Sequence, residues 1–273
     1  MLTYAAGHRL LTLSGAIIAL YVVLGVVGPW LAPYDPNALD PAQSLEPPSQ
    51  THWMGTDQLG RDVFSRWLVA AGYTLVGAFG VVLIAAVGGF VYGLTTAYVG
   101  GRFDALSMRF FDLMFAFPPL VVAIILVATF GPGLATVVVG VGVGYLPAIA
   151  RIIRSEAIIQ REQQYVAAAQ GLGYSPGRII FRHIMPNCTS QIIVQVSINL
   201  PYAIIDLAGL SFLGFGIQPP DADWGKMLAE GQQVVLFAPW LVLFPSIAII
   251  VLVLNWNVFG AQLRRALDPR QRR

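Results

Sequence analysis

The chain has 273 residues, of which 56% are apolar and only 11% are charged, and its formal net charge at pH 7 is +2. Soluble domains carry about 25% charged residues, so this composition excludes an ordinary soluble enzyme and indicates an integral membrane protein. The basic residues are scattered, with one dense cluster at the C-terminus, which argues against a nucleic-acid-binding protein.

Six apolar runs are long enough to cross a membrane, which takes roughly 20 residues. The runs are continuous and do not alternate with polar residues, so they predict helices and not the strands of a barrel. We therefore expect an all-α integral membrane protein with six transmembrane helices. The predicted spans are about Leu10–Leu31, Tyr73–Val99, Phe111–Phe130, Leu134–Ile153, Ile192–Phe212 and Ala238–Phe259.

The first span is predicted to be a retained anchor. Its apolar run is long, and no clear small-residue cleavage site follows it, unlike a signal peptide. A proline-rich loop, about Ala32–Gly72, comes next. We expect residues 1–72 to form the anchor and an external loop, and residues 73–273 to form a core with a large loop at about 154–191.

The basic residues predict the orientation of the spans. Cytoplasmic loops carry an excess of Lys and Arg. Six spans place both termini on one side, and only Arg61, Arg66 and Lys226 fall on the other. Both termini are therefore predicted to be cytoplasmic. The basic residues on that side are Arg9, Arg102, Arg109, Arg151, Arg154, Arg161, Arg178, Arg182, Arg264, Arg265, Arg270, Arg272 and Arg273.

Catalytic and nucleotide-binding motifs are not recognisable. The single lysine, Lys226, is followed by Met227, where a phosphate-binding loop needs Ser or Thr. The histidines at 8, 52 and 183 lie in separate regions, so no metal site is predicted. We expect no cofactor in this chain and no catalysis by it. If ATP drives the protein, another subunit binds it.

Three alternating glycines lie in the fourth span. Gly140, Gly142 and Gly144 resemble part of a nucleotide-binding loop, but they sit within a membrane run. Small residues in membrane helices allow close helix packing, and this is the interpretation that we favour.

The polar loop after the fourth span is predicted to form two short helices. Arg161–Leu172 is rich in good helix formers. Gly173 suits a helix end in left-handed conformation, Ser175 an N-cap, and Pro176 the first turn of a second helix.

One face of the first short helix is apolar. Tyr165, Ala168, Ala169 and Leu172 follow the i, i+3, i+4, i+7 pattern. The small alanines between two larger apolar residues would allow this face to approach a groove on a partner protein closely. The periodicity alone leaves open whether this face docks a partner or packs on the protein's own helices.

The same segment resembles the cytoplasmic docking loop of ATP-binding-cassette (ABC) importer permeases. In that loop a Glu-Ala-Ala triplet precedes a fixed Gly, and a Pro follows the Gly by thirteen residues. Gly173 and Pro186 keep this spacing, but Ala167 replaces the Glu, so the usual acidic contact is absent unless Glu162 provides it. The resemblance implies ATPase docking by Tyr165, Ala167, Ala168, Ala169, Leu172, Gly173, Arg178, Arg182, His183 and Pro186.

Other motifs resemble the dipeptide, oligopeptide and nickel subfamily, and in particular its second permease subunit. They are His52–Arg66, Arg109–Pro118, Leu210–Gly214, Gln218–Pro220, Trp224–Gly231 and Ala266–Pro269. The resemblance implies the type I importer (MetI-like) permease fold in a bacterial inner or plasma membrane.

The subfamily also implies a set of partners. They are a homologous permease, two ATPase domains that bind ATP and Mg²⁺, an extracytoplasmic substrate-binding protein and membrane lipid. This chain would supply half of the translocation pathway. Di- or oligopeptides are the expected substrates, while nickel chelates, glutathione and haem remain open.

Asp206 is a candidate pathway residue in the fifth span. An ionisable residue inside a membrane is costly and is a functional candidate by default. It could attract a cationic group of the substrate, or pair with the partner permease as a structural contact. Since Asp206 is the one good mid-membrane candidate, a proton-coupled carrier or channel is the less favoured class, and a structural scaffold is weaker still.

The outer loop at about 213–237 is a candidate docking site for the binding protein. Asp221, Asp223 and Trp224 follow two prolines that stiffen the loop. Acids and an aromatic residue suit a protein contact. The alternative is a solvated loop whose Trp224 anchors at the membrane interface.

Overall fold

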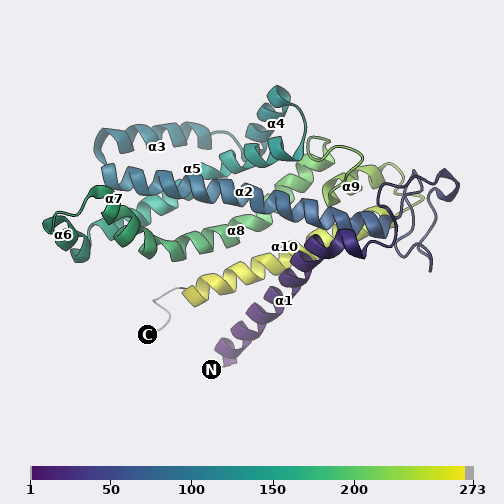
Figure 1. Cartoon of the computed structure of the whole chain (residues 1–273), viewed down its shortest axis with the longest axis horizontal. Helices are drawn as coiled ribbons and strands as arrows, with labels where there is room; N and C mark the ends of the chain where they lie inside the picture. Colours follow the sequence, from purple (N-terminus) through teal and green to yellow (C-terminus); the bar gives the residue numbers. More distant parts are fainter. Residues whose placement is uncertain (1, 268–273) are drawn as a thin grey trace.

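A computed structural model describes residues 2–267 of the chain, and it is helical throughout except for loops and one isolated bridge between Thr56 and Asp62. Most helices run along the long axis of the molecule (Figure 1). Asp268, Pro269, Arg270, Arg272 and Arg273, which entered the predictions above, lie outside the described residues. The elements are α1 (Leu2–Leu31), η1 (Pro41–Gln43), α2 (Val63–Val99), α3 (Gly101–Phe115), α4 (Pro119–Phe130), α5 (Leu134–Arg161), α6 (Gln164–Gly171), α7 (Pro176–Ile179), η2 (Ile180–Ile184), α8 (Met185–Phe212), α9 (Trp224–Gln232) and α10 (Trp240–Leu267).

Five helical stretches of residues 2–267 are long and apolar enough to cross a membrane. They match five of the six predicted spans, namely those in α1, α2, α5, α8 and α10, although α10 begins at Trp240, two residues after the predicted start of the last span. A sixth crossing is present if α3 and α4 are counted as one broken span. The all-helical prediction is confirmed.

The third predicted span is not one helix. In place of a continuous Phe111–Phe130, α3 and α4 meet at an angle of 83°. Pro118 lacks an N–H donor and disfavours helical backbone at Phe117, which stops α3. Pro119 then starts α4 at its first position, where proline is well tolerated.

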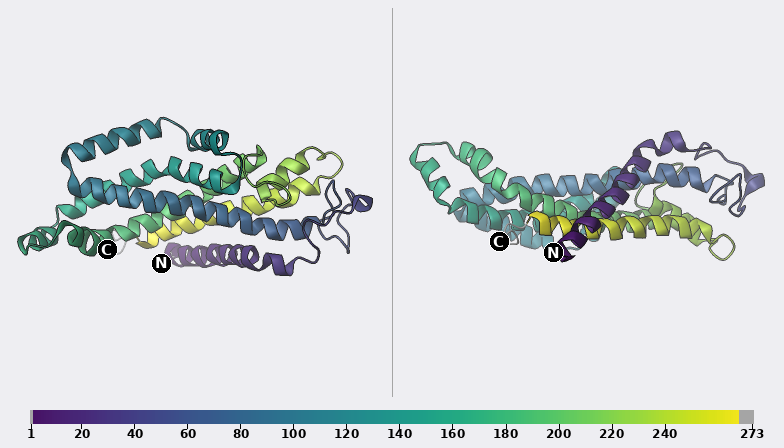
Figure 2. Two further views of the ribbon diagram at one scale, coloured as in Figure 1. Left: turned by 45° about the horizontal axis from the view of Figure 1, so that its top comes forward. Right: turned by 90° about the horizontal axis from the view of Figure 1, so that it is seen from below.

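The expected division at residue 72 falls inside α2, which begins at Val63. Asp62 caps this helix, since its carboxylate accepts a hydrogen bond from the Ser65 amide at 2.7 Å. Glycines bring α1 onto α2: a β-carbon added at Gly28 would lie 2.6 Å from the Leu68 carbonyl oxygen. The purple α1 crosses α2 obliquely in Figure 2, and Ile18 and Tyr21 of α1 join the main core.

The main core is formed by residues of α1, α2, α4, α5, α8, α9 and α10, and a second cluster joins α2, α5, α6, α7, η2 and α8. The predicted glycine packing in α5 is confirmed, because β-carbons added at Gly140 and Gly144 would lie 2.6 and 2.7 Å from the Cα atoms of Ala123 and Pro119 in α4. Gly142 faces α2 instead, with Ile84 at 3.0 Å. Alternate glycines thus let α5 approach two helices on two sides.

Replacing Gly140 by valine is therefore expected to separate α4 from α5. The valine β-carbon meets main-chain atoms of Ala123, which cannot move aside as a flexible side chain would. We expect a destabilisation of about 1–3 kcal/mol or more, measured as a lower melting temperature of the purified protein. Gly209→Ala is the control, because a β-carbon at Gly209 meets nothing within 4 Å. Equal melting temperatures for the two variants would contradict the packing argument.

The two ends of the molecule differ in character. At one end the loop 32–62 packs with α9, and at the other α6 and α7 project beyond the long helices (Figures 1 and 2). The long helices alternate in direction between these ends. We call these two ends of the molecule the α9 end and the α6 end.

Candidate functional site

The α6 segment is a separate short helix at the end of the long helix α5. α5 ends at Arg161, and Glu162 and Gln163 form the corner before α6. The predicted single helix Arg161–Leu172 is thus split. Arg161 ties the corner to α2, since its Nη1 donates to the Ala97 carbonyl at 2.8 Å.

Gly173 ends α6 in the predicted left-handed conformation, with φ +75°. The Gly173 amide donates to the Gln170 carbonyl at 2.9 Å, and the Tyr174 amide donates to the Ala169 carbonyl at 3.2 Å. This pair of bonds is a Schellman motif, which requires a left-handed residue at this position. The role predicted for Gly173 in helix termination is confirmed.

The second short helix is brief and runs into a π-helical turn. α7 starts at Pro176 as predicted, but the Ser175 side chain makes no capping hydrogen bond. η2 is a π-helix that joins α7 to α8. π-Helical turns are rare in proteins, and those that do occur are frequently found at functional sites.

The predicted apolar face of α6 is divided between the interior and solvent. Ala169 is buried, together with Val166, against Ile179, Ile184 and Cys188. Ala169 therefore packs on the chain itself and is not available to a partner in this conformation.

The other residues of that face are open to a partner. Tyr165 and Ala168 are exposed, and Leu172 shows 73% of its surface. Ala167, which is not part of that face, is exposed as well. Phe181 of η2, which the sequence reasoning did not single out, is 66% exposed. The packing interpretation thus holds for Ala169, docking by the exposed residues stays a prediction, and the exposed set forms an apolar projection.

Basic and aromatic side chains surround this projection. The Arg178 guanidinium lies 4.4 Å from the ring centroid of Tyr174, and Tyr174 stacks on His183 at 5.8 Å between centroids. His183 Nε2 is buried without a hydrogen-bond partner in the part of the chain that the structure describes. Arg182, Pro186 and Glu162 are exposed.

Ion pairs link α5, which leads into α6, to α3. Arg154 donates two hydrogen bonds to Asp104, at 2.5 and 2.6 Å, and Arg151 donates one to Asp112 at 2.6 Å. These contacts join the half of α5 that precedes α6, which is predicted to be cytoplasmic, to α3.

Asp206 lies on α8 and faces α5. Its Oδ2 accepts a hydrogen bond from the Tyr145 hydroxyl at 2.6 Å. Asp206 is half-buried, and Tyr202, one turn earlier, is exposed. The structure thus places the carboxylate on a helix face that the chain itself leaves partly open.

Two of the three residues predicted for binding-protein docking are buried instead. Asp223 caps α9: its carboxylate accepts from the Lys226 amide at 2.8 Å and from the Ser211 hydroxyl at 2.5 Å. Burial raises the pKa of the Asp223 carboxyl, although these hydrogen bonds act in the opposite direction.

Trp224 is fully buried between α1 and α2, with Tyr21 and Trp67 as ring neighbours, and its indole N–H donates to the Trp67 carbonyl at 3.2 Å. Trp224 is therefore neither exposed to a docking protein nor placed at the membrane interface as an anchor. Only Asp221 of the three is partly accessible.

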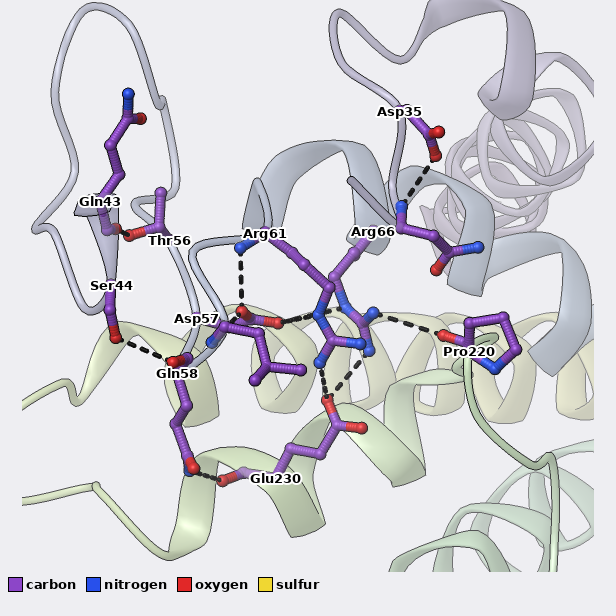
Figure 3. Close-up of polar contacts among 12 residues, drawn as sticks. Asp35, Gln43, Ser44, Thr56, Asp57, Gln58, Arg61, Arg66, Pro220 and Glu230 are labelled. Atoms are coloured by element: carbon purple, nitrogen blue, oxygen red, sulfur yellow. Dashed lines mark hydrogen bonds and ion pairs between the residues drawn. The ribbon is translucent and has the colours of Figure 1, made fainter. Parts of the chain in front are cut away.

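A buried ion cluster at the α9 end was not predicted (Figure 3). Glu230 of α9 accepts from Arg66 Nη2 at 2.9 Å and from Arg61 Nη2 at 3.1 Å. Asp57 accepts from Arg61 Nε at 2.6 Å, and Gln58 donates to the Glu230 carbonyl at 3.0 Å. The cluster ties the loop 32–62 to α9, and it brings the His52–Arg66 and Trp224–Gly231 motifs into contact.

Comparison with known proteins places this arrangement in a family. Residues 89–273 match the model of the binding-protein-dependent transport system inner membrane component. The chain belongs to this family. Residues 6–48 also match the N-terminal transmembrane domain of oligopeptide transport permease C, so α1 and the start of the outer loop are family features too.

Individual permeases are similar over nearly the whole chain. A dipeptide transport system permease protein of Alkalihalophilus pseudofirmus is 38% identical, over 97% of this chain and 87% of the relative. A probable D,D-dipeptide transport system permease protein of Escherichia coli K12 is 39% identical, over 97% of this chain and 89% of the relative. A glutathione permease of Escherichia coli is 40% identical, over 96% and 87%.

The fold agrees with a solved permease. A chain of the MetNI methionine ABC transporter superposes with a TM-score of 0.55 at 16% identity, covering 71% of this family member and 94% of that chain. The MetI-like fold is thereby confirmed. This family member is a multi-pass permease subunit of a bacterial ABC importer.

Proposed function

We propose that this permease imports short peptides with ATP hydrolysed on a separate subunit. The observation that carries the proposal is the projecting α6, which follows α5 after a corner. Tyr165 and Ala168 of α6, and Leu172 at its end, are exposed beyond the membrane helices. The relatives named for dipeptides and glutathione support the substrate class.

The α6 projection suits docking of an ATPase subunit. Leu172 and Phe181 offer apolar anchors, and the alanines at 167 and 168 permit close approach. Arg178, Arg182 and His183 form the basic rim. We assign Ala169 to the support of the helix and not to the contact, because it is buried.

The α6 end is then cytoplasmic, in keeping with the excess of arginine on that side. The remaining partners follow from the family: a homologous permease, two ATPase domains that bind ATP and Mg²⁺, and an extracytoplasmic binding protein. At the opposite end, Asp221 is retained as a contact for the binding protein. Asp223 and Trp224 hold its loop in place from inside.

ATP binding to the ATPase subunits would drive alternating access through α6 and the long helix α5. Shifting an equilibrium from 1:99 to 99:1 needs about 5.5 kcal/mol of differential binding. Closure of two ATPase domains can deliver this to the membrane only through a rigid element. α5 runs as one helix from Leu134 to Arg161 with Pro147 inside it. The part after Pro147 is anchored to α2 by Arg161 and to α3 by Arg154.

Uptake by the complete importer tests the proposal. The permease pair, ATPase and binding protein are reconstituted in proteoliposomes and offered L-Ala-L-Ala, D-Ala-D-Ala and glutathione. We expect accumulation of one or more of these with ATP and without a proton gradient. Accumulation that requires a proton gradient and no ATP would establish a carrier instead, and failure of this chain to co-purify with any ATPase would remove the docking role.

A further inference from the structure

One face of α8 carries a continuous row of polar side chains. The row consists of Gln191, Gln195, Asn199, Tyr202 and Asp206, which we call the polar stripe. Successive members are four, four, three and four residues apart, so they stay on one side of a helix with 3.6 residues per turn. At 1.5 Å per residue the stripe extends about 22 Å, which is most of a bilayer's apolar thickness.

Four of the five members of the polar stripe make no side-chain hydrogen bond to another helix within residues 10–266. All five side chains are partly or well exposed. Asn199 donates to the Gln195 carbonyl of its own helix at 2.9 Å, and Asp206 accepts from Tyr145. The side chains of Gln191, Gln195 and Tyr202 make no hydrogen bond within residues 10–266 of this structure.

Amide side chains that bond to no other residue of the chain are unusual in a membrane helix. Polar groups in apolar surroundings are costly unless they are hydrogen-bonded, and in membrane proteins they face the bundle interior or a water-filled path. The polar stripe therefore marks the side of α8 that meets water or a ligand, in contrast to the lipid-facing leucines and valines elsewhere.

Charge gives the stripe a direction. Asp206 is the only ionisable carboxylate on α8, and the helix carries no Lys or Arg. It lies about 9 Å, or six residues, from the end of α8 at Phe212, towards the α9 end. From there the neutral side chains lead towards the α6 end.

We propose that the polar stripe is the hydrogen-bonding track along which a peptide passes, with Asp206 and Tyr145 receiving its protonated amino terminus. Amides and a hydroxyl can both donate to and accept from peptide groups without selecting a side chain. An extended peptide repeats every two residues, at about 6.6–6.8 Å, close to the 6 Å of one i, i+4 step. This inference rests on the proposed import function.

A seam with the partner permease is the competing occupant of the stripe. Asparagine and glutamine do join membrane helices. The carboxylate favours the peptide, because α8 has no Lys or Arg to offset a negative charge within a permanent helix seam. A substrate amino group at pH 7 is positively charged and complements the carboxylate.

The experiment uses the reconstituted importer with whichever of L-Ala-L-Ala, D-Ala-D-Ala and glutathione it accumulates. Asp206→Asn is expected to lower uptake about tenfold, and Asp206→Glu to restore most of it, because the charge matters more than the length. Asn199→Leu is expected to lower uptake about fivefold, and Asn199→Gln to restore it. Asn257→Leu is the matched control: Asn257 is an exposed amide on α10 whose side chain bonds, within residues 10–266, only to the Val253 carbonyl of its own helix.

The ATPase readout separates the possible outcomes. On our proposal, ATP hydrolysis stimulated by the loaded binding protein and recovery of the partner permease stay at wild-type levels while uptake falls. Loss of the partner or of stimulated ATPase in the stripe variants would establish a seam and overturn the inference. Unchanged uptake in Asp206→Asn and Asn199→Leu would also overturn it. Absence of ATP-dependent uptake by the wild-type importer would instead refute the proposed function itself.

Discussion

Replacing Gly173 by valine is expected to uncouple ATP hydrolysis from transport. Gly173 holds φ at +75° to close the Schellman motif of α6, and a β-branched residue is strongly disfavoured there. Relieving that strain, about 1–3 kcal/mol, would break the bonds to Gln170 and Ala169 and redirect the chain after Leu172. We expect ATPase activity stimulated by the loaded binding protein to fall to the basal rate in the purified importer.

Gly171→Ala provides the matched control. Gly171 lies two residues earlier, has no positive φ, and an added β-carbon would meet nothing within 4 Å. It should keep wild-type coupling and assembly. Since a β-carbon at Gly173 also meets nothing within 4 Å, the difference between the variants reports backbone conformation and not a clash. Wild-type stimulated activity in an assembled Gly173→Val importer would remove α6 as the coupling element.

Replacing Glu230 by alanine is expected to destabilise the α9 end. Arg66 and Arg61 are buried, and each donates to the Glu230 carboxylate (Figure 3). Breaking a buried ion pair by removing one partner costs about 3–5 kcal/mol, because the other charge remains buried. Asp57 still faces both arginines, and Glu230 is itself partly exposed, so we expect a loss near the lower limit of that range.

The melting temperature of the purified permease measures this loss. A decrease of about 5 °C or more is expected for Glu230→Ala. Glu46→Ala is the control, since Glu46 is an exposed acid of the same end whose side chain joins no ion pair within residues 10–266. A melting temperature of Glu230→Ala equal to that of the control would show that Asp57 alone balances the two arginines.

Hydrophobic length made most of the fold predictable. The runs ending at Leu31, Val99 and Phe212 end where the helices end, because a proline or glycine follows within two residues, namely Pro33, Gly100 and Gly214. The break at Phe117 was missed, since counting apolar residues across Pro118 and Pro119 takes no account of the backbone. Local backbone chemistry, and not hydropathy, decides such a position.

The site was predictable where its chemistry is local. Gly173 and Pro176 act through their own φ preferences, which any sequence reveals. Asp223 and Trp224 were misplaced because their burial depends on Ser211, Trp67 and Tyr21, which are distant in the chain. The polar stripe was within reach of the sequence, since its period is that of a helix, but Asp206 alone drew attention by its charge.

The ion cluster also sets an order of events during synthesis. Glu230 lies 164 residues after Arg66 and 169 after Arg61. At about 5–20 residues per second, the ribosome takes roughly ten to thirty seconds to bridge that gap. Meanwhile Asp57, four residues before Arg61, is already present as a counter-ion for both arginines. Asp57 can therefore neutralise part of the charge of Arg61 and Arg66 until α9 has been synthesised and Glu230 binds both arginines.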